Sequence, residues 1–228
     1  TGCTGGVGRM EAPEQTLTAP VPPGWNGENG LPTTVTMWVL SCDHVSLGEF
    51  ERGPVQLVVE SHEKFNAPDN CREGDYTFLN ILTRIVWSDA EIAGAMQDEL
   101  GIPTSVGTIE RIVTGSEAAS VTTFAWTIDG QESSFQSGRF QNDILDYDNA
   151  YRYVWADEGR LGLIDFRWDV RQTWLEPSLV FGTFAPPMIL ASAGVPVVGG
   201  VGVVNEEIFP GGEFKFFEGY ECATQVSP

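Results

Sequence analysis

The sequence has 228 residues, of which 42% are hydrophobic and 11% aromatic, and it carries a formal net charge of −20. A chain of this size can bury one substantial core, and no apolar run reaches the roughly 18 residues that a membrane-spanning helix needs. The negative charge repels phosphate backbones and anionic membranes, so we expect neither a nucleic-acid partner nor a transmembrane segment.

Glycine and proline are frequent at the start of the chain and disfavour regular structure there. We therefore predict an extended tail at residues 1–20, one domain at residues 21–222 and a short tail at residues 223–228. Within the domain, Val35–Cys42 and Val55–His62 are rich in β-branched residues and are bounded by turn residues. These two segments predict an antiparallel pair of strands.

A further strand is predicted at Tyr76–Trp87, and a helix follows it. Ser88 is the expected N-cap, and Glu91, three residues later, completes a capping box. Gly101 supplies a stop signal. Three apolar residues recur between these signals at a spacing of four: Ile92, Met96 and Leu100. The pattern predicts one short helix at about residues 88–100.

Beyond the helix the chain returns to short strands separated by turn residues. Asp129-Gly130 is a typical two-residue hairpin turn. Residues 143–152 are ambiguous, and a short helix is one interpretation. Strands are predicted at residues 108–114, 120–129, 132–139, 161–168 and 178–184, with two or three more near the C terminus. The prediction is a mostly β, single-domain fold: an antiparallel barrel or cone with one packed helix.

Four cysteines stand far apart, and no CxxC or mixed His/Cys cluster accompanies them, so a structural zinc site is not expected. The even number predicts two disulfides and an oxidising compartment. Three pairings are possible. We favour Cys42–Cys71, which flanks a predicted hairpin, and Cys3–Cys222, which would tie both ends of the chain to the domain.

The cysteines also bear on location. We interpret the chain as a secreted protein, extracellular or periplasmic. A lipid anchor is the alternative, because Thr1-Gly2-Cys3 is similar to the end of a lipoprotein signal. Lipidation would leave three thiols, an odd number, so we favour secretion without an anchor.

Several short motifs occur in an order that resembles the acetoacetate decarboxylase-like proteins. They are Pro22-Pro23-Gly24, Gly53-Pro54, Gly74-Asp75-Tyr76 and Glu99-Leu100-Gly101-Ile102-Pro103. The resemblance implies an antiparallel cone or barrel whose interior holds a small organic acid or a similar ligand. It also implies a Schiff-base lysine just after the last proline, where this chain has Thr104 and Ser105. Because neither side chain can form an imine, acetoacetate decarboxylase activity is predicted to be absent.

Other polar groups have simpler interpretations. Strand alternation places Glu60 and His62 on one face, where a carboxylate and an imidazole could transfer protons. We favour a surface salt bridge near a strand end. Two histidines are too few for a histidine-built metal site, and the aspartates at 143, 146 and 148 lack the spacing of an EF-hand loop. We therefore predict no metal and no cofactor.

The leading hypothesis is a secreted barrel that binds a small, partly apolar molecule. One alternative is a lyase, hydratase or cyclase that works without a lysine, through a carboxylate or His62. Another is an extracellular structural subunit, for which a homo-oligomer is one possible assembly. Whether the chain is an enzyme stays open. The predicted ligand-binding residues are Gln56, Glu99, Thr104, Ser105 and Trp126.

Overall fold

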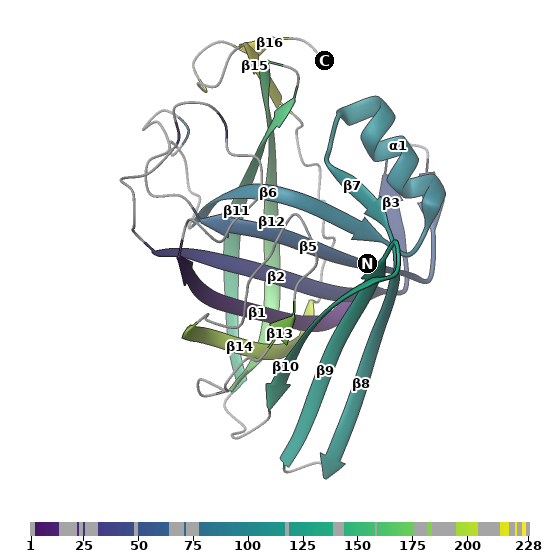
Figure 1. The fold of residues 1–228 in the computed structure, drawn as a ribbon, viewed down its shortest axis with the longest axis vertical. Helices are drawn as coiled ribbons and strands as arrows, with labels where there is room; N and C mark the ends of the chain where they lie inside the picture. The colour runs from purple at the N-terminus through teal and green to yellow at the C-terminus, as the bar shows by residue number, and fades with distance from the viewer. Residues whose placement is uncertain are drawn as a thin grey trace.

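The computed structural model describes residues 3–13, 22, 25, 32–47, 50–63, 71, 78–116, 119–138, 144–157, 159–175, 182–183, 195–204, 215–218, 222 and 225–226. These residues form one helix and three sheets (Figure 1). The prediction of a mostly β, single-domain fold with one short helix is confirmed.

The largest sheet has ten strands and follows the order β11-β6-β5-β2-β1-β14-β12-β15-β16, with β7 beside β6. β12 also pairs with β11. The strands are β1 (Cys3–Pro13), β2 (Pro32–Cys42), β5 (Val55–Glu63), β6 (Phe78–Trp87), β7 (Thr104–Val106), β11 (Ile144–Asp157), β12 (Arg160–Leu175), β14 (Val195–Val204), β15 (Lys215–Glu218) and β16 (Gln225–Val226).

The second sheet has four strands in the order β13-β10-β9-β8, and the third is a two-stranded hairpin. Figure 1 shows β8 and β9 extending away from the ten-stranded sheet at the end where α1 lies. The elements are α1 (Ala90–Leu100), β8 (Thr108–Ser116), β9 (Ala119–Ile128), β10 (Gln131–Gly138) and β13 (Gly182–Thr183), with β3 (Val45–Leu47) and β4 (Phe50–Arg52) in the hairpin.

The expected all-antiparallel barrel is corrected in two ways. The strands are divided among three sheets rather than forming a single one, and β6 pairs in parallel with both β7 and β11. The parallel pairing of β6 and β7 follows from the helix between them, because α1 turns the chain back far enough for β7 to run in the same direction beside the last three residues of β6.

The central strands β2, β5 and β6 have buried side chains on both faces of the ten-stranded sheet, since successive side chains point to opposite faces and each face is covered. We call the face covered by α1 the outer face, where Ile92 and Met96 pack against Trp87. We call the other the inner face, where β8, β9 and β10 cover the sheet and Trp126 packs against Val58. Because both faces of β5 and β6 are covered, the sequences of these two strands are nearly continuous apolar runs.

The predicted N-terminal tail is wrong for residues 3–13, which form β1 between β2 and β14. Glycine marks close packing here rather than a loop. A Cβ on Gly5 would lie 1.9 Å from the carbonyl oxygen of Val39, and one on Gly8 would lie 3.1 Å from the ring of Phe135. The domain therefore begins well before residue 21.

The helix is confirmed, but its N-cap is Asp89 rather than Ser88. The Asp89 carboxylate accepts hydrogen bonds from the backbone N–H groups of Glu91 and Ile92. The Ser88 hydroxyl is occupied elsewhere, because it accepts a hydrogen bond from the backbone N–H of Gln56 at 2.9 Å. At the other end, Gly101 has a φ of 58° and closes the helix as predicted.

Two further local predictions have different outcomes. The Asp129-Gly130 turn joins β9 to β10, with positive φ at both residues. The short helix considered at residues 143–152 is wrong, because residues 144–157 form β11. Of the strand expected at residues 178–184, only residues 182–183 fall within the described part of the chain.

Both disulfides exist, but the predicted pairing is wrong. Cys3 is bonded to Cys42 and Cys71 to Cys222, so all four cysteines are oxidised. Cys3 and Cys42 stand opposite each other on β1 and β2. The wrong pairing follows from the failure to predict β1. Without that strand, no strand register placed Cys3 opposite Cys42.

Candidate functional site

A β-bulge on the inner face gathers four polar side chains that the sequence keeps apart. Glu60 pairs with Arg84, but the next residue, Ser61, pairs with Leu82, so Thr83 is an extra residue in β6. A bulge re-aims side chains, and bulges are frequent beside active sites. Here the bulge directs both Thr83 and Arg84 toward β5, where Glu60 and His62 lie.

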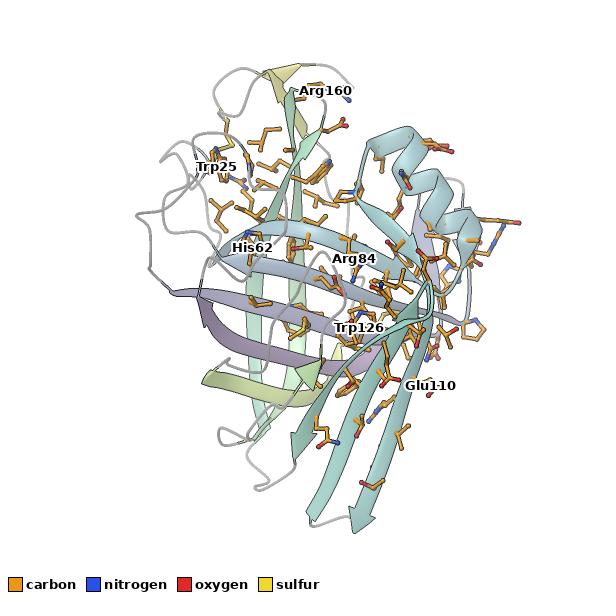
Figure 2. The ribbon with its side chains drawn as sticks, in the orientation of Figure 1. Trp25, His62, Arg84, Glu110, Trp126 and Arg160 are labelled. Atoms are coloured by element: carbon orange, nitrogen blue, oxygen red, sulfur yellow. A yellow bond between two sulfur atoms is a disulfide. The ribbon has the colours of Figure 1, made fainter. Side chains whose placement is uncertain are left out.

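Glu60 and Arg84 form a buried ion pair. The carboxylate is 1% exposed and the guanidinium 8%. Arg84 Nε donates to Glu60 Oε2 at 2.6 Å, and its Nη2 donates to Oε1 at 3.1 Å. Trp126 Nε1, on β9, donates to Oε1 at 2.7 Å. Figure 2 shows the Trp126 side chain approaching this part of the sheet from β9. The carboxylate thus receives three hydrogen bonds from two sheets.

His62 lies next to this pair along β5 and is completely buried. Its Nδ1 is 3.4 Å from the Thr83 hydroxyl. Its Nε2 is buried and has no hydrogen-bond partner within the described residues. We refer to Glu60, His62, Thr83, Arg84 and Trp126 as the bulge cluster.

Burial controls the ionisation of the cluster. It raises the pKa of the Glu60 carboxyl above its ordinary value of 4.5, and Arg84 and Trp126 oppose that rise. Burial also lowers the pKa of His62 from 6.5 to about 4. The imidazole is therefore neutral at neutral pH. The surface salt bridge favoured for Glu60 and His62 is wrong, because both side chains lie in the interior.

The surroundings of the cluster are apolar. Val35 and Met37 of β2 stand opposite His62 and Glu60, and both are fully buried. Aromatic rings from the second sheet cover this side. Trp126 meets Phe135 edge to face at 6.3 Å between centroids, and Phe124 stacks on Phe135 at 5.0 Å. The inner face thus combines an apolar wall with a compact group of polar atoms.

The five predicted ligand-binding residues are not brought together. Thr104 donates its hydroxyl hydrogen to the Ala93 carbonyl, toward α1, while Glu99 is exposed on the helix. Gln56 is half-buried near the start of β5. Of the five, Trp126 belongs to the bulge cluster through its hydrogen bond to Glu60. Their role in binding a ligand stays a prediction.

Ser105 has a position that bears on the resemblance. It pairs in parallel with Val86, two residues beyond Arg84 on β6. Cross-strand neighbours share a face, so Ser105 and Val86 both belong to the inner face. The site where the resemblance implies a Schiff-base lysine therefore shares a sheet face with the Glu60–Arg84 pair.

Sequence reasoning found part of the cluster. Strand alternation correctly placed Glu60 and His62 on one face, and Trp126 was selected for its aromatic ring. Arg84 and Thr83 were missed, because a bulge leaves no pattern in the sequence. One signal in the sequence could have identified Arg84: it is an arginine in an otherwise largely apolar strand. A buried cation needs a partner of opposite charge, so this pattern predicts a nearby carboxylate.

Two absences apply to the described part of the chain. It contains no group of three or more His, Cys, Asp or Glu side chains that could hold a metal ion. No helix within the same residues combines the length and apolar character needed to cross a bilayer.

Comparison with known proteins gives a match in structure alone. No protein-family model and no curated protein matches the sequence. A structure of acetoacetate decarboxylase aligns with 89% of this chain and 82% of its own, at 11% identity and a TM-score of 0.52. Acetoacetate decarboxylase from Legionella pneumophila aligns with 100% of this chain and 88% of its own, at 7% identity and a TM-score of 0.48.

A third solved structure is the enduracididine biosynthesis enzyme MppR, complexed with the condensation product of pyruvate and imidazole 4-carboxaldehyde. It aligns with 93% of this chain and 88% of its own, at 15% identity and a TM-score of 0.48. At such identities the likeness concerns the fold, and the match with a TM-score of 0.52 carries it. The chain therefore has an acetoacetate decarboxylase-like fold.

Proposed function

We propose that this protein binds a small, partly apolar organic molecule on the inner face of the ten-stranded sheet, beside the bulge cluster, without Schiff-base decarboxylation. The observation that carries the proposal is the buried Glu60–Arg84 pair with Trp126 donating to it. Removing two charges from water costs several kcal/mol per ion, so such a pair is a poor means of stabilising a core. Strongly desolvated charges of this kind concentrate at functional sites.

Apolar walls and convergent polar groups are the usual composition of a small-molecule site. The bulge cluster supplies the polar groups, and Val35, Met37 and Phe135 supply apolar surface around it. The acetoacetate decarboxylase-like fold supports a small-molecule ligand in general, since the resemblance implies one in the interior of a cone or barrel.

We propose the absence of Schiff-base chemistry because a Schiff base needs a lysine amine at the site, and the positions of the lysines bear on this. The sequence has two lysines, Lys64 and Lys215. Lys215 opens β15 and pairs with Leu163 of β12, whereas Lys64 lies outside the described residues. Ser105, on the inner face, has a hydroxyl group that cannot form an imine.

Secretion is supported by the two disulfides, which persist in oxidising compartments. The Cys3–Cys42 bond also argues against a lipid anchor at Cys3, because one sulfur cannot form both a disulfide and a thioether. The protein is therefore proposed to work outside the cytoplasm as a non-anchored protein.

Ligand binding is tested by a thermal-shift screen of small organic molecules, followed by calorimetry on the hits. Glu60→Gln should weaken binding of a hit about tenfold or more, because it disturbs the charge and hydrogen bonds of the cluster. Glu99→Gln is the matched control, since Glu99 is exposed on α1 and should leave binding unchanged. A screen without hits, or equal effects of the two variants, would contradict the proposal.

Decarboxylation is tested by borohydride reduction in the presence of acetoacetate, followed by mass spectrometry of the intact protein. We expect no covalent adduct and no release of carbon dioxide above the uncatalysed rate. A single adduct that maps to Lys64 or Lys215 would show that an amine elsewhere in the chain has taken over the role.

A further inference from the structure

We propose that Nε2 of His62 is the polar contact for the ligand, and that the ligand is an uncharged molecule with a hydroxyl group on an apolar body. This inference rests on the proposed function and adds the class of ligand and the atom that recognises it. It is independent of the Glu60–Arg84 pair, whose oxygens already have their hydrogen bonds.

The unsatisfied nitrogen is the first step. His62 is 0% exposed, and its Nε2 has no partner among the residues that the structure describes. Native proteins rarely leave a buried polar nitrogen unmatched, and the exceptions call for a ligand, an ion or a water. Because Nδ1 already faces the Thr83 hydroxyl, Nε2 is the atom that remains for a guest molecule.

The charge of the guest follows from its neighbours. Among the side chains that the structure describes on this face of β5, β6 and β11, the charged ones are Glu60, Arg84 and Arg152. Glu60 and Arg84 neutralise each other, and Arg152 donates to the Cys71 carbonyl at 3.1 Å. A charged guest beside the neutral imidazole would lose its hydration without a counter-ion from this cluster. An uncharged molecule avoids that cost.

A hydroxyl group matches both states of the neutral imidazole. If the Thr83 hydroxyl donates to Nδ1, Nε2 carries the proton and needs an acceptor. If Nδ1 donates to Thr83, Nε2 needs a donor. A hydroxyl oxygen fulfils either need, whereas a ketone or an ammonium group fulfils one.

The body of the guest is apolar because the neighbours of His62 are apolar. Val35 stands opposite it on β2 and Ile81 opposite it on β6, and both are fully buried. The Thr83 hydroxyl adds one polar atom to this surface beside His62, and the polar groups of the Glu60–Arg84 pair lie further along the same face of β5. A small aromatic or branched alcohol has the required combination of one hydroxyl group and a hydrocarbon frame.

The test compares three probes of similar size: benzyl alcohol, toluene and benzoate. Calorimetry on the full chain should show benzyl alcohol binding about tenfold more tightly than toluene, the usual effect of one hydrogen bond, and benzoate binding more weakly than benzyl alcohol. Equal affinities of benzyl alcohol and toluene would overturn the inference and leave the proposed function standing. Failure of all three probes to bind would overturn the inference alone, because the thermal-shift screen of small organic molecules decides the proposed function.

Nitrogen NMR on protein with ¹⁵N-labelled histidine locates the contact. The chain has two histidines, so His44, which is half-buried, is an internal reference. Benzyl alcohol should shift the Nε2 resonance of His62 and leave His44 unchanged. If the alcohol binds without moving that resonance, the nitrogen is satisfied by an internal water and the inference is wrong.

His62→Phe removes both nitrogens and keeps the planar shape. We expect this variant to bind benzyl alcohol and toluene equally, while His44→Phe keeps the tenfold preference of the natural chain. A preference retained in His62→Phe would overturn the inference. Should that variant fail to fold, the probe comparison and the NMR on the unaltered protein still decide it.

Discussion

At the scale of single residues, the bulge cluster contains ionisable side chains that lose their hydration when the protein folds. Glu60 and Arg84 are acceptable in the interior only as a pair, because each compensates the desolvated charge of the other. His62 avoids the cost of burying a charge because its imidazole stays neutral. These two solutions lead to different predictions.

Replacing Arg84 alone should lower the free energy of unfolding more than replacing both Glu60 and Arg84. Arg84→Met leaves the Glu60 carboxylate buried without its guanidinium, and we expect a loss of about 3–5 kcal/mol in the free energy of unfolding. The double variant Glu60→Met/Arg84→Met should recover most of that loss. Urea denaturation measures both. A double variant as unstable as the single one would show that the pair itself contributes net stability.

The stability should depend on pH through His62. Its pKa is lowered to about 4 in the folded protein from 6.5, so between these values the unfolded chain binds a proton that the folded protein does not. The free energy of unfolding should therefore rise with pH in this window, by up to about 1.4 kcal/mol per pH unit from this group.

Urea denaturation from about pH 4 to about pH 7 checks this slope. His62→Phe should flatten it relative to the natural chain, because the variant has no imidazole at this position to bind a proton in the unfolded state. Glu60 acts in the opposite direction, because its raised pKa favours the folded state at low pH. A slope in His62→Phe as steep as that of the natural chain would refute the role assigned to His62.

At the scale of elements, glycine was the residue most easily misread. The glycines of β1 predicted a tail, yet they let β1 pack closely against β2 and under Phe135. In the sequence, a glycine that fits a crowded strand and one that opens a loop are identical. The Asp129-Gly130 turn and the α1 helix were predictable because local chemistry determines them.

Two glycine substitutions should therefore have opposite effects. A Cβ on Gly162 would lie 2.2 Å from the indole of Trp155, so Gly162→Ala should destabilise the protein by about 1–3 kcal/mol or more. A Cβ on Gly94, in α1, would meet nothing within 4 Å, so Gly94→Ala should stabilise the protein by about 1 kcal/mol. Thermal unfolding monitored by circular dichroism measures both, and shifts of the same sign would contradict the packing described.

The start of α1 offers a second test at this scale. Asp89→Ala removes the carboxylate that caps the helix and should cost about 1 kcal/mol. Asp98→Ala, at an exposed position of the same helix, should cost nothing. Urea denaturation compares the two variants. An equal loss would mean that the cap of α1 is not the Asp89 carboxylate.

At the scale of the whole molecule, the disulfides join segments far apart in the sequence. Cys71–Cys222 spans 151 residues and Cys3–Cys42 spans 39. Their pairing could not be derived from the sequence, because it depends on the register of β1 against β2. Likewise the mostly β class was predictable from strand signals, whereas the separation into three sheets depends on long-range contacts.

The longer disulfide should contribute more to stability. In the chain-entropy model, Cys71–Cys222 contributes about 5 kcal/mol and Cys3–Cys42 about 4 kcal/mol. Cys71→Ala/Cys222→Ala should therefore be the less stable of the two paired variants in urea denaturation. Thiol titration of the unfolded natural chain should find no free cysteine, and any reactive thiol would show that a pair is not formed.

The place of β1 between β2 and β14 has a consequence for biogenesis. This strand acquires its second neighbour only when residues 195–204 are available, about 190 residues further along the chain. Sheets that depend on such distant pairing form slowly, because the intervening segment must first be brought round. Completion of the sheet around β1 is therefore expected to be a late event in folding, which leaves one edge of this strand open until residues 195–204 arrive.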